Sequence, residues 1–437
     1  MVYFLFSIYI LSKIQKSDAA KRLVKGSVWS FVGLILTKLI TLASGILCAH
    51  VFTKEEYGQF GMVRSTIDLF LSVGAVGMGA TTSKYIAQYL STAKEKITEV
   101  YGMTNVFTII CGVIVSSVFY LCSGNIALRM LNNIELELPI KLGSLLLLVM
   151  ILNGMQNGTL SGFEKFKTIT INKFIASIFE ASLMLVGAYY WKVSGAIFGF
   201  GLGYAILWLL NKLSIKNAFR EHNVIYRPYN FYKSSTSILY KFSLPALLTS
   251  LSLTPVYWIV RTILVNHDGY GELAIFEASM QWRVAILFIP SVFGSVLLPI
   301  LSGYKGNMSS YKKFFHLNLL SNVLVSLVVA IILVIASPYI MGLYGKEYDN
   351  NLPMIILMVS TIISAANNVS GVMLSSRGYM WAHFIINIIY SIILLFISYY
   401  LIKIGYGATG LAMAFLLSNF IYSILFYFYS IKVVLKE

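Results

Sequence analysis

The chain has 437 residues, of which 58% are hydrophobic and only 11% are charged, and its formal net charge at pH 7 is +16. An ordinary soluble protein carries about 25% charged residues, which help to cover its surface. This composition excludes a soluble protein. No segment is polar enough to predict a separate extramembrane domain or an arm that binds nucleic acid, so we expect most of the chain to lie in lipid.

Twelve apolar stretches have the length of about 20 residues that a helix needs to cross a bilayer. They are too long and too uniformly apolar for barrel strands, so helices are predicted and the fold class is an all-α polytopic membrane protein. The predicted spans are residues 27–50, 59–82, 101–123, 138–160, 170–191, 194–212, 242–264, 272–301, 314–338, 352–374, 380–402 and 407–431.

The distribution of basic residues predicts the orientation of these spans. With the N-terminus in the cytoplasm, most of the 33 basic residues fall on the cytoplasmic side, whereas the acidic residues show no bias. This predicts a multi-pass protein of the inner (cytoplasmic) membrane with both termini in the cytoplasm, and it explains the net charge without nucleic acid. Residues 2–12 are apolar but lack the flanks of a signal peptide. They are either a short interfacial segment or an over-extended start, so it stays open whether residues 1–20 belong to the native chain.

The longest hydrophilic segment divides the predicted spans into six and six. Two features recur in both halves: Tyr57-Gly58 and Tyr270-Gly271 are 213 residues apart, and Gly195-Ala196 and Gly407-Ala408 are 212 apart. Near-equal offsets predict two six-helix bundles that are parallel repeats, with a substrate path between them. The predicted segments are a cytoplasmic N-terminal segment (1–26), an N-terminal bundle (27–212), a cytoplasmic linker (213–241) and a C-terminal bundle (242–437).

Several short motifs occur in a characteristic order along nearly the whole chain. They are KGSVWSF at 25–31, FTKEEYGQF at 52–60, SKYIAQY at 83–89, FSLP at 242–245, VLLPILS at 296–302 and YGKEY at 344–348. In these motifs the chain resembles the Wzx-type polysaccharide flippases of the multidrug/oligosaccharidyl-lipid/polysaccharide exporter superfamily. The resemblance implies a flippase that moves polyprenyl-pyrophosphate-linked oligosaccharide repeat units across the membrane by alternating access. It also implies contact with membrane lipid and with polysaccharide assembly proteins.

Charged residues within the predicted spans are the candidate binding groups, because a charge at bilayer depth costs at least a few kcal/mol. The resemblance implies a pyrophosphate cargo, which arginine can hold through two hydrogen bonds. We therefore predict that a hydrated cationic path binds the substrate through Lys38, Arg64, Arg283 and Arg261. The alternatives are buried ion pairs that fix helix packing, such as Arg64 with Asp68, and for Arg261 and Lys141 a side chain that reaches the outer headgroups.

Asp68, Glu180 and Glu277 are the acidic residues at depth. They are predicted either to couple transport to a sodium ion or a proton, or to balance the charge of the cations. The offset of 213 maps Arg64 onto Glu277. Equivalent positions can approach each other across the repeat axis, so we hypothesise that these two pair when the outer mouth is closed. A double mutant that exchanges the two charges tests this pairing.

Other side chains have two interpretations each. Asn153, Gln156, Asn157, Asn367 and Asn368 could bond sugar hydroxyls, but such amides more often bond neighbouring helices, and we favour that interpretation. Prolines 245, 255, 290 and 299 interrupt the seventh and eighth spans and predict that these spans bend.

Enzyme signatures are missing from the sequence. It has no phosphate-binding Gly-Lys-Ser/Thr loop, and its five histidines and three cysteines lack metal-ligand spacing. We therefore predict a transporter with no catalytic residue, no metal and no cofactor besides a coupling ion. One alternative is a multidrug or cation exporter of the same superfamily, which should have an acidic path. Another is a membrane-embedded glycosyltransferase or polymerase, which should have a long outer loop or an acidic catalytic pair.

Overall fold

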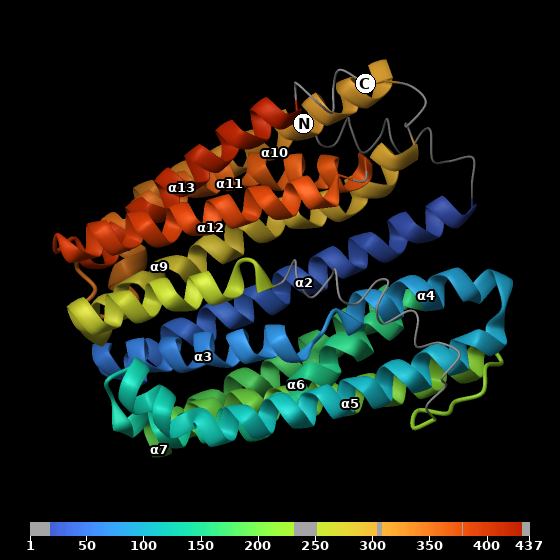
Figure 1. Cartoon of the computed structure of the whole chain (residues 1–437), viewed down its shortest axis with the longest axis horizontal. Coiled ribbons are helices and arrows are strands. Elements are labelled where there is room, and N and C mark those ends of the chain that lie inside the picture. Colours follow the sequence, from blue (N-terminus) through green and yellow to red (C-terminus); the bar gives the residue numbers. More distant parts are fainter. Residues whose placement is uncertain (1–17, 231–250, 304–307, 378, 431–437) are drawn as a thin grey trace. The chain divides into compact units, whose positions relative to one another are not determined.

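The computed structural model describes residues 18–230, 251–303, 308–377 and 379–430. In this part of the chain the regular elements are helices, as Figure 1 shows, which fits long apolar runs whose backbone groups must bond within one segment. They are α2 (Asp18–Val51), α3 (Lys54–Gly74), α4 (Met78–Thr92), α5 (Lys94–Asn125), a π-helical turn (Ile126–Met130), a 3-10 turn (Ile134–Leu136), α6 (Glu137–Gly162), α7 (Phe166–Glu221), α9 (Thr254–Gly303), α10 (Met308–Gly342), α11 (Leu352–Arg377), α12 (Met380–Lys403) and α13 (Gly407–Tyr429).

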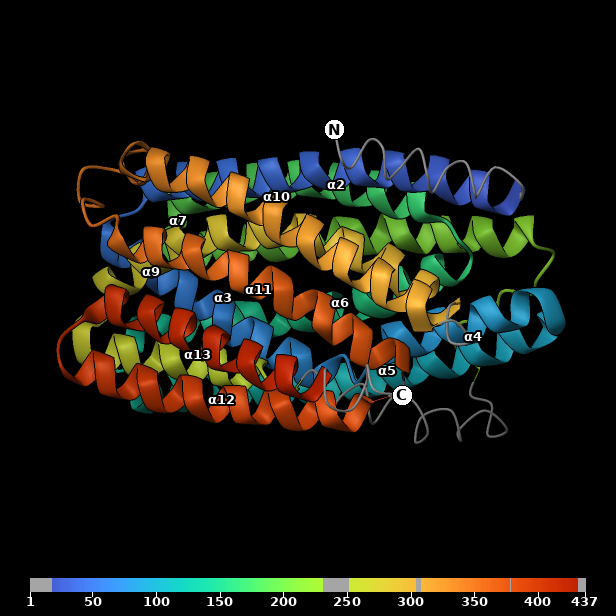
Figure 2. The same ribbon diagram turned by 90° about the horizontal axis from the view of Figure 1, so that it is seen from above.

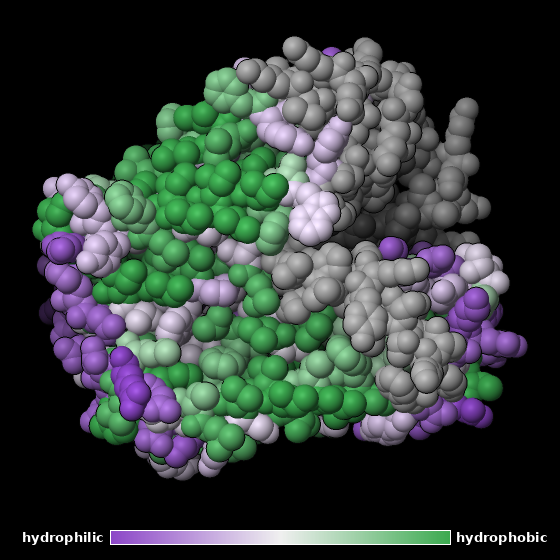
Figure 3. Space-filling model, viewed as in Figure 1, coloured by the Kyte–Doolittle hydropathy of each residue, from purple (hydrophilic) through white to green (hydrophobic). Residues whose placement is uncertain are grey.

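The prediction of an all-α polytopic membrane protein is confirmed. Among the described residues, eight helical stretches are long and apolar enough to cross a membrane, or nine if α3 and α4 form one broken span. The space-filling view shows a broad apolar surface, with hydrophilic residues gathered toward its margins (Figure 3). Large apolar side chains such as Leu121, Tyr339 and Phe396 are more than 70% exposed, as expected for helices that face lipid.

Two of the long helices contain a break. The backbone of α7 leaves the helical conformation at Trp191 and Lys192, and that of α9 does so at Gly269, where φ is 85° and ψ is 176°. This conformation is essentially restricted to glycine. The break in α7 lies between the predicted spans 170–191 and 194–212, and the break in α9 lies between 242–264 and 272–301. The first residues of the predicted seventh span, with Pro245, lie outside the described residues.

A bend that the sequence analysis did not predict interrupts the second span. Helices α3 and α4 meet at 45°, and Val76 and Gly77 between them both have a positive φ. The glycines around the bend allow close packing. A Cβ atom on Gly158 of α6 would lie only 2.0 Å from the carbonyl oxygen of Gly79 on α4, so the two backbones are in direct contact.

The chain divides into two compact units. Unit 1 comprises Met1–Thr41, Ile67–Ile126 and Ile134–Ser250, and unit 2 comprises Leu42–Thr66, Ala127–Asn133 and Leu251–Glu437. Residues of α2 and α3 therefore belong to both units. Residues 127–133 belong to unit 2 because they bond to α9: the Tyr270 hydroxyl donates to the carbonyl oxygen of Leu131 at 2.8 Å, and Asn266 donates to that of Met130 at 3.0 Å.

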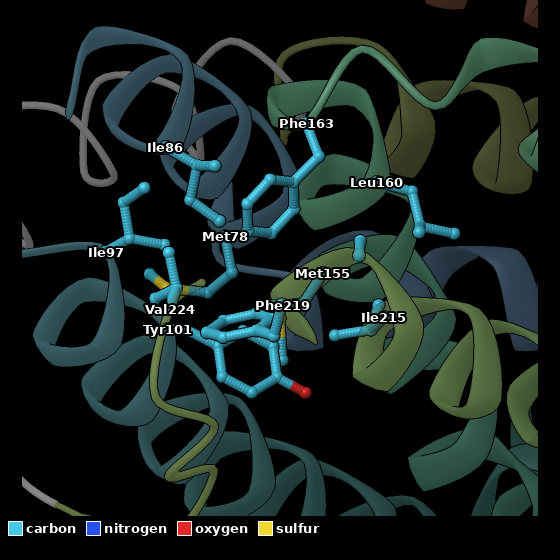
Figure 4. Packing of buried hydrophobic residues seen from close by; sticks show 11 residues of the cluster. Met78, Ile86, Ile97, Tyr101, Met155, Leu160, Phe163, Ile215, Phe219 and Val224 are labelled. Carbon is cyan, nitrogen blue, oxygen red and sulfur yellow. The ribbon is translucent and has the colours of Figure 1, made fainter. Parts of the chain in front are cut away.

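Unit 1 contains a hydrophobic cluster in which residues of α4, α5, α6 and α7 pack together (Figure 4). A short segment after α7, residues 222–230, covers part of α5, and we call it the strap. Thr98 donates to the carbonyl oxygen of Ile225 at 2.8 Å, and Asn105 donates to that of Pro228 at 2.7 Å. The cluster consists of Met78, Ile86, Ile97, Tyr101, Met155, Leu160, Phe163, Ile215, Ala218, Phe219 and Val224.

In unit 2, α11 packs against α9, α10 and α13, and α12 and α13 lie side by side (Figure 2). Phe276 of α9 and Phe415 of α13 are fully buried, with ring centroids 5.7 Å apart. The carboxylate of Glu272 accepts a hydrogen bond of 2.8 Å from the backbone N–H of Ala408, and so it caps the N-terminus of α13.

Candidate functional site

Arg261 and Glu277 form an ion pair across the break in α9. Arg261 precedes Gly269 and Glu277 follows it, and Arg261 Nε donates to Glu277 Oε1 at 2.5 Å. Arg261 Nη1 also donates to the carbonyl oxygen of Tyr257 at 3.0 Å, and the guanidinium lies 5.6 Å from the ring centroid of Phe276. The two side chains are 11% and 19% exposed, so the pair is partly buried but still accessible.

The first half of α3 packs against α9 beside this pair. A Cβ atom on Gly58 would lie 2.0 Å from the carbonyl oxygen of Tyr270, and one on Gly61 would lie 2.7 Å from Glu277 Cγ. Arg64 is one helical turn beyond Gly61, and its guanidinium lies 5.5 Å from the ring centroid of Phe60. Unit 2 therefore brings three predicted site residues, Arg64, Arg261 and Glu277, onto adjacent helices.

A buried aromatic cluster adjoins the same end of α3. It unites two motifs of the sequence analysis, because Tyr57 contacts both Tyr344 and Tyr348, with ring centroids 6.1 and 6.2 Å away. The Tyr344 hydroxyl donates to Gln281 Oε1 at 2.8 Å and accepts from Trp282 Nε1 at 3.1 Å. These two motifs thus meet in one packing contact.

Arg283 has a different environment. It is only 8% exposed, and its guanidinium donates to Ser360 Oγ at 3.2 Å and to Ser364 Oγ at 2.9 Å on α11. It also lies 5.4 Å from the ring centroid of Phe415. Among the described residues no carboxylate lies within 4 Å of it, so the guanidinium is a buried cation whose observed partners are neutral.

The remaining predicted site residues, Lys38, Asp68 and Glu180, belong to unit 1. Lys38 is half-buried and is close enough to Lys173 for their positive charges to repel each other. Asp68 is exposed. Glu180, on the first arm of α7, packs tightly against the second arm, because a Cβ atom on Gly203 would lie 2.4 Å from Glu180 Cβ. Lys141 forms an ion pair with Glu137 at 2.6 Å.

The amide side chains that the sequence singled out mostly bond neighbouring helices. In unit 1, Asn153 donates to the carbonyl oxygen of Tyr204 at 2.8 Å, and Asn157 accepts from Asn211 at 3.3 Å. In unit 2, Asn367 donates to the carbonyl oxygen of Asn419 at 3.2 Å. Gln156 is buried, and its Oε1 has no partner among the described residues, whereas Asn368 is exposed.

Several polar residues at these sites were missed by the sequence analysis. Asn172 and Asn211 are buried and bonded to each other at 3.0 Å, and Ser360, Ser364 and Asn419 extend the surroundings of Arg283. Amides and hydroxyls at the centre of apolar spans were the available signal, but serine and asparagine are too frequent in this chain to single these out. Within the described residues, no group of three or more histidine, cysteine, aspartate or glutamate side chains could hold a metal ion.

Comparison with known proteins supports the resemblance seen in the motifs. Residues 23–305 match the family described as "Polysaccharide biosynthesis protein". The EPS I polysaccharide export inner membrane protein EpsE of Ralstonia solanacearum is 22% identical over 401 residues, which are 90% of this chain and 89% of the relative. The lipid III flippase of Escherichia coli (strain K12) is 25% identical over 287 residues, 64% of this chain and 67% of the relative. A putative O-antigen transporter of Shigella flexneri is 22% identical over 335 residues, 75% of this chain and 78% of the relative.

Two solved structures with a similar fold are transporters. An inward-facing multidrug resistance MATE family transporter of the MOP superfamily has a TM-score of 0.74 at 16% identity, covering 92% of this chain and 95% of its own. A MOP superfamily transporter from Pyrococcus furiosus, described as having a binding pocket of reverse polarity, has a TM-score of 0.69 at 15% identity, covering 97% and 98%. The relatives and these neighbours are export proteins, transporters and flippases, which confirms the prediction that the chain is not an enzyme.

Proposed function

The chain belongs to the polysaccharide biosynthesis protein family, and from this premise we propose that it is a flippase for polyprenyl-pyrophosphate-linked oligosaccharide repeat units in the inner membrane. Relatives named as a polysaccharide export inner membrane protein, an O-antigen transporter and a lipid III flippase support this proposal. The oligosaccharide on its lipid is the cargo, membrane lipid surrounds the carrier, and polysaccharide assembly proteins are its further partners.

The observation that carries the proposal is the environment of Arg283. A buried cation with neutral partners is costly, and an anionic headgroup would offset that cost. Pyrophosphate is such a group, and the planar guanidinium can donate two hydrogen bonds to it. A drug or cation exporter, the second candidate, would need the opposite polarity. The likeness to multidrug transporters concerns the fold alone and does not favour that candidate.

The proposed architecture is twelve membrane spans in two parallel six-helix repeats. The breaks in α7 and α9 support it, since each divides a long helix into two. Side-chain networks also support it, because each unit has polar groups bonded between neighbouring helical segments at corresponding places. The pairs Asn153 and Asn367, Asn172 and Asn387, and Asn211 and Ser423 are 214, 215 and 212 residues apart, close to the offsets of the repeated motifs.

The proposed mechanism is alternating access with cytoplasmic termini. Lys38, Arg64, Arg261 and Arg283 would attract the pyrophosphate, while the lipid tail stays in the bilayer. Asp68 and Glu180 are the candidates for coupling to a sodium ion or a proton, and Glu277 is a charge partner of Arg261.

The experiment is a translocation assay in vesicles that contain the purified protein and a lipid-linked oligosaccharide. Arg283→Ala should reduce the rate of transfer between leaflets at least tenfold, and Lys38→Ala and Arg64→Ala should reduce it less. Lys403→Ala serves as a control, because this exposed residue at the end of α12 has no proposed role. Wild-type protein that does not accelerate transfer, but that transports a lipophilic cation, would replace this proposal with the exporter.

A further inference from the structure

We propose that Glu277 competes with the anionic cargo for Arg261. The Glu277 carboxylate binds the Arg261 guanidinium when no cargo is bound, and it displaces the anionic headgroup from Arg261 so that the cargo can leave. This inference rests on the proposed function, because it assumes an anionic cargo. It assigns to Glu277 the role of limiting how tightly the pyrophosphate binds, instead of binding a coupling ion.

The geometry leaves part of Arg261 available to a ligand. The guanidinium uses Nε for Glu277 and Nη1 for the carbonyl oxygen of Tyr257. Among the described residues no acceptor bonds to its Nη2, so three of its five N–H groups, both on Nη2 and the second on Nη1, remain available for an incoming phosphate oxygen. An anion can therefore begin to bind at Nη2 before Glu277 leaves Nε.

Arg261 and Arg283 differ in whether a carboxylate is bound to the guanidinium. Arg261 lies on the first arm of α9 and Arg283 on the second, both in unit 2. Of these two arginines, only Arg261 has a carboxylate partner in the described part of the chain. An anion that reaches Arg283 meets a cation with neutral partners, whereas an anion that reaches Arg261 must exchange places with Glu277. Binding at Arg261 is thus an exchange of one charge-assisted hydrogen bond for another, and its net free energy is small.

The environment of Glu277 allows this exchange. Its side chain is 19% exposed, and on one side it packs against Gly61 of α3, where a Cβ atom would lie 2.7 Å from its Cγ. Arg261 on its own hairpin is bonded to it, and Arg64 lies one helical turn beyond Gly61 on α3. A carboxylate displaced from Arg261 would therefore remain beside the segment of α3 that carries Arg64.

The alternative role is purely structural, in which the ion pair only holds the two arms of α9 together. The two roles predict different effects of Glu277→Gln on anion affinity. If Glu277 is a competitor, its neutralisation exposes Arg261 and tightens anion binding. If it is only a brace, its neutralisation loosens the hairpin and leaves anion binding unchanged or weaker.

The experiment measures the binding of inorganic pyrophosphate to the purified full-length protein in detergent, by isothermal titration calorimetry. Glu277→Gln should bind pyrophosphate on the order of tenfold more tightly than wild type, since a charged competitor is lost. Arg261→Gln should bind more weakly, and Arg261→Gln/Glu277→Gln should show no gain over Arg261→Gln alone. Glu272→Gln is the matched control, because it neutralises a carboxylate on the same helix that caps α13 and does not touch Arg261.

A second titration uses farnesyl pyrophosphate, which distinguishes a lipid headgroup from free pyrophosphate. The same gain for Glu277→Gln is expected with this probe, and a gain with free pyrophosphate alone would overturn the assignment to a lipid-linked cargo. If wild type binds and Glu277→Gln binds no better, or the gain survives without Arg261, the competitor role is wrong and the proposed function stands. If no variant binds either probe, the anionic cargo is wrong as well. The melting temperature of each variant, measured in parallel, shows whether a lost signal reflects unfolding.

Discussion

Arg261 and Glu277 lie eight residues before and eight residues after Gly269, and their side chains meet at 2.5 Å. At about 1.5 Å per residue, each is about 12 Å along its arm from the break, so the ion pair links the two arms at equal depth. The ion pair depends on Gly269, because the chain reversal at this residue places Arg261 and Glu277 opposite each other.

Gly269→Ala should therefore destabilise the hairpin. The backbone at Gly269 has φ of 85° and ψ of 176°, and a Cβ atom there would meet no neighbour within 4 Å. The cost then comes from backbone strain alone, about 1–3 kcal/mol. Thermal unfolding in detergent should show a lower melting temperature. Gly154→Ala is the control: it also has open space around its Cβ but lies within α6, where alanine should be neutral or stabilising. Equal effects of the two substitutions would contradict the strain argument.

Replacing Arg283 should separate function from stability. Arg283→Met removes a buried cation but leaves its hydroxyl neighbours bonded, since Ser360 also donates to the carbonyl oxygen of Leu357 and Ser364 donates to Asn419. We expect a melting temperature that is unchanged or higher, because an apolar side chain of similar volume avoids the desolvation of a charge. Pyrophosphate binding and vesicle transport should both be lost. A large fall in melting temperature with binding retained would instead show that Arg283 is a packing residue.

Asn211 should contribute to stability in unit 1. Its side chain is fully buried, accepts from Asn172 at 3.0 Å and donates to Asn157 at 3.3 Å. Asn211→Ala leaves buried partners unsatisfied, which costs about 1–3 kcal/mol. Asn368→Ala, which changes an exposed amide on α11, should have little effect on thermal unfolding. The interpretation of these amides as helix-to-helix contacts fails if the two substitutions are equally mild.

The strap should loosen in mild acid. His222 stacks on Phe163 with ring centroids 5.2 Å apart, and burial lowers its pKa, with the charge of Lys165 lowering it further. The attached strap favours the neutral form of His222. Below the ordinary histidine pKa of about 6.5, His222 therefore binds more protons when the strap is detached than when it is attached. The contribution of His222 is present above that pH and is lost as the pH falls through the lowered value. Amide hydrogen exchange of residues 222–230, corrected for intrinsic rates, should lose protection by a few-fold at pH 5.5. His222→Gln should show no such pH dependence, and an identical loss in this variant would contradict the assignment.

The sequence predicted the helices well where an apolar run ends at a polar or glycine residue. The predicted span 138–160 corresponds to α6 at Glu137–Gly162, and 407–431 corresponds to α13 at Gly407–Tyr429. The bend at Val76 and Gly77 was not predicted, because the glycines at 74, 77 and 79 are equally compatible with an unbroken, closely packed helix.

The site was predicted as a set of residues but not as a set of partners. Charge at bilayer depth identified Arg64, Arg261, Glu277 and Arg283, since hydropathy alone makes such residues conspicuous. The structure pairs Glu277 with Arg261, which the sequence could not indicate, because the pairing depends on the reversal at Gly269. The hypothesis that Arg64 pairs with Glu277 when the outer mouth closes stays a prediction. The serine partners of Arg283 lie more than 75 residues away in sequence, where no local pattern reveals them.

The brevity of the breaks at Trp191-Lys192 and at Gly269 has a practical consequence for handling the protein. A protease must draw several residues into an extended conformation before it can cut, and a reversal of one or two residues between packed helices offers no such substrate. Limited digestion of the folded protein should therefore spare both turns, and the fragments it yields should keep each of these two helical hairpins whole.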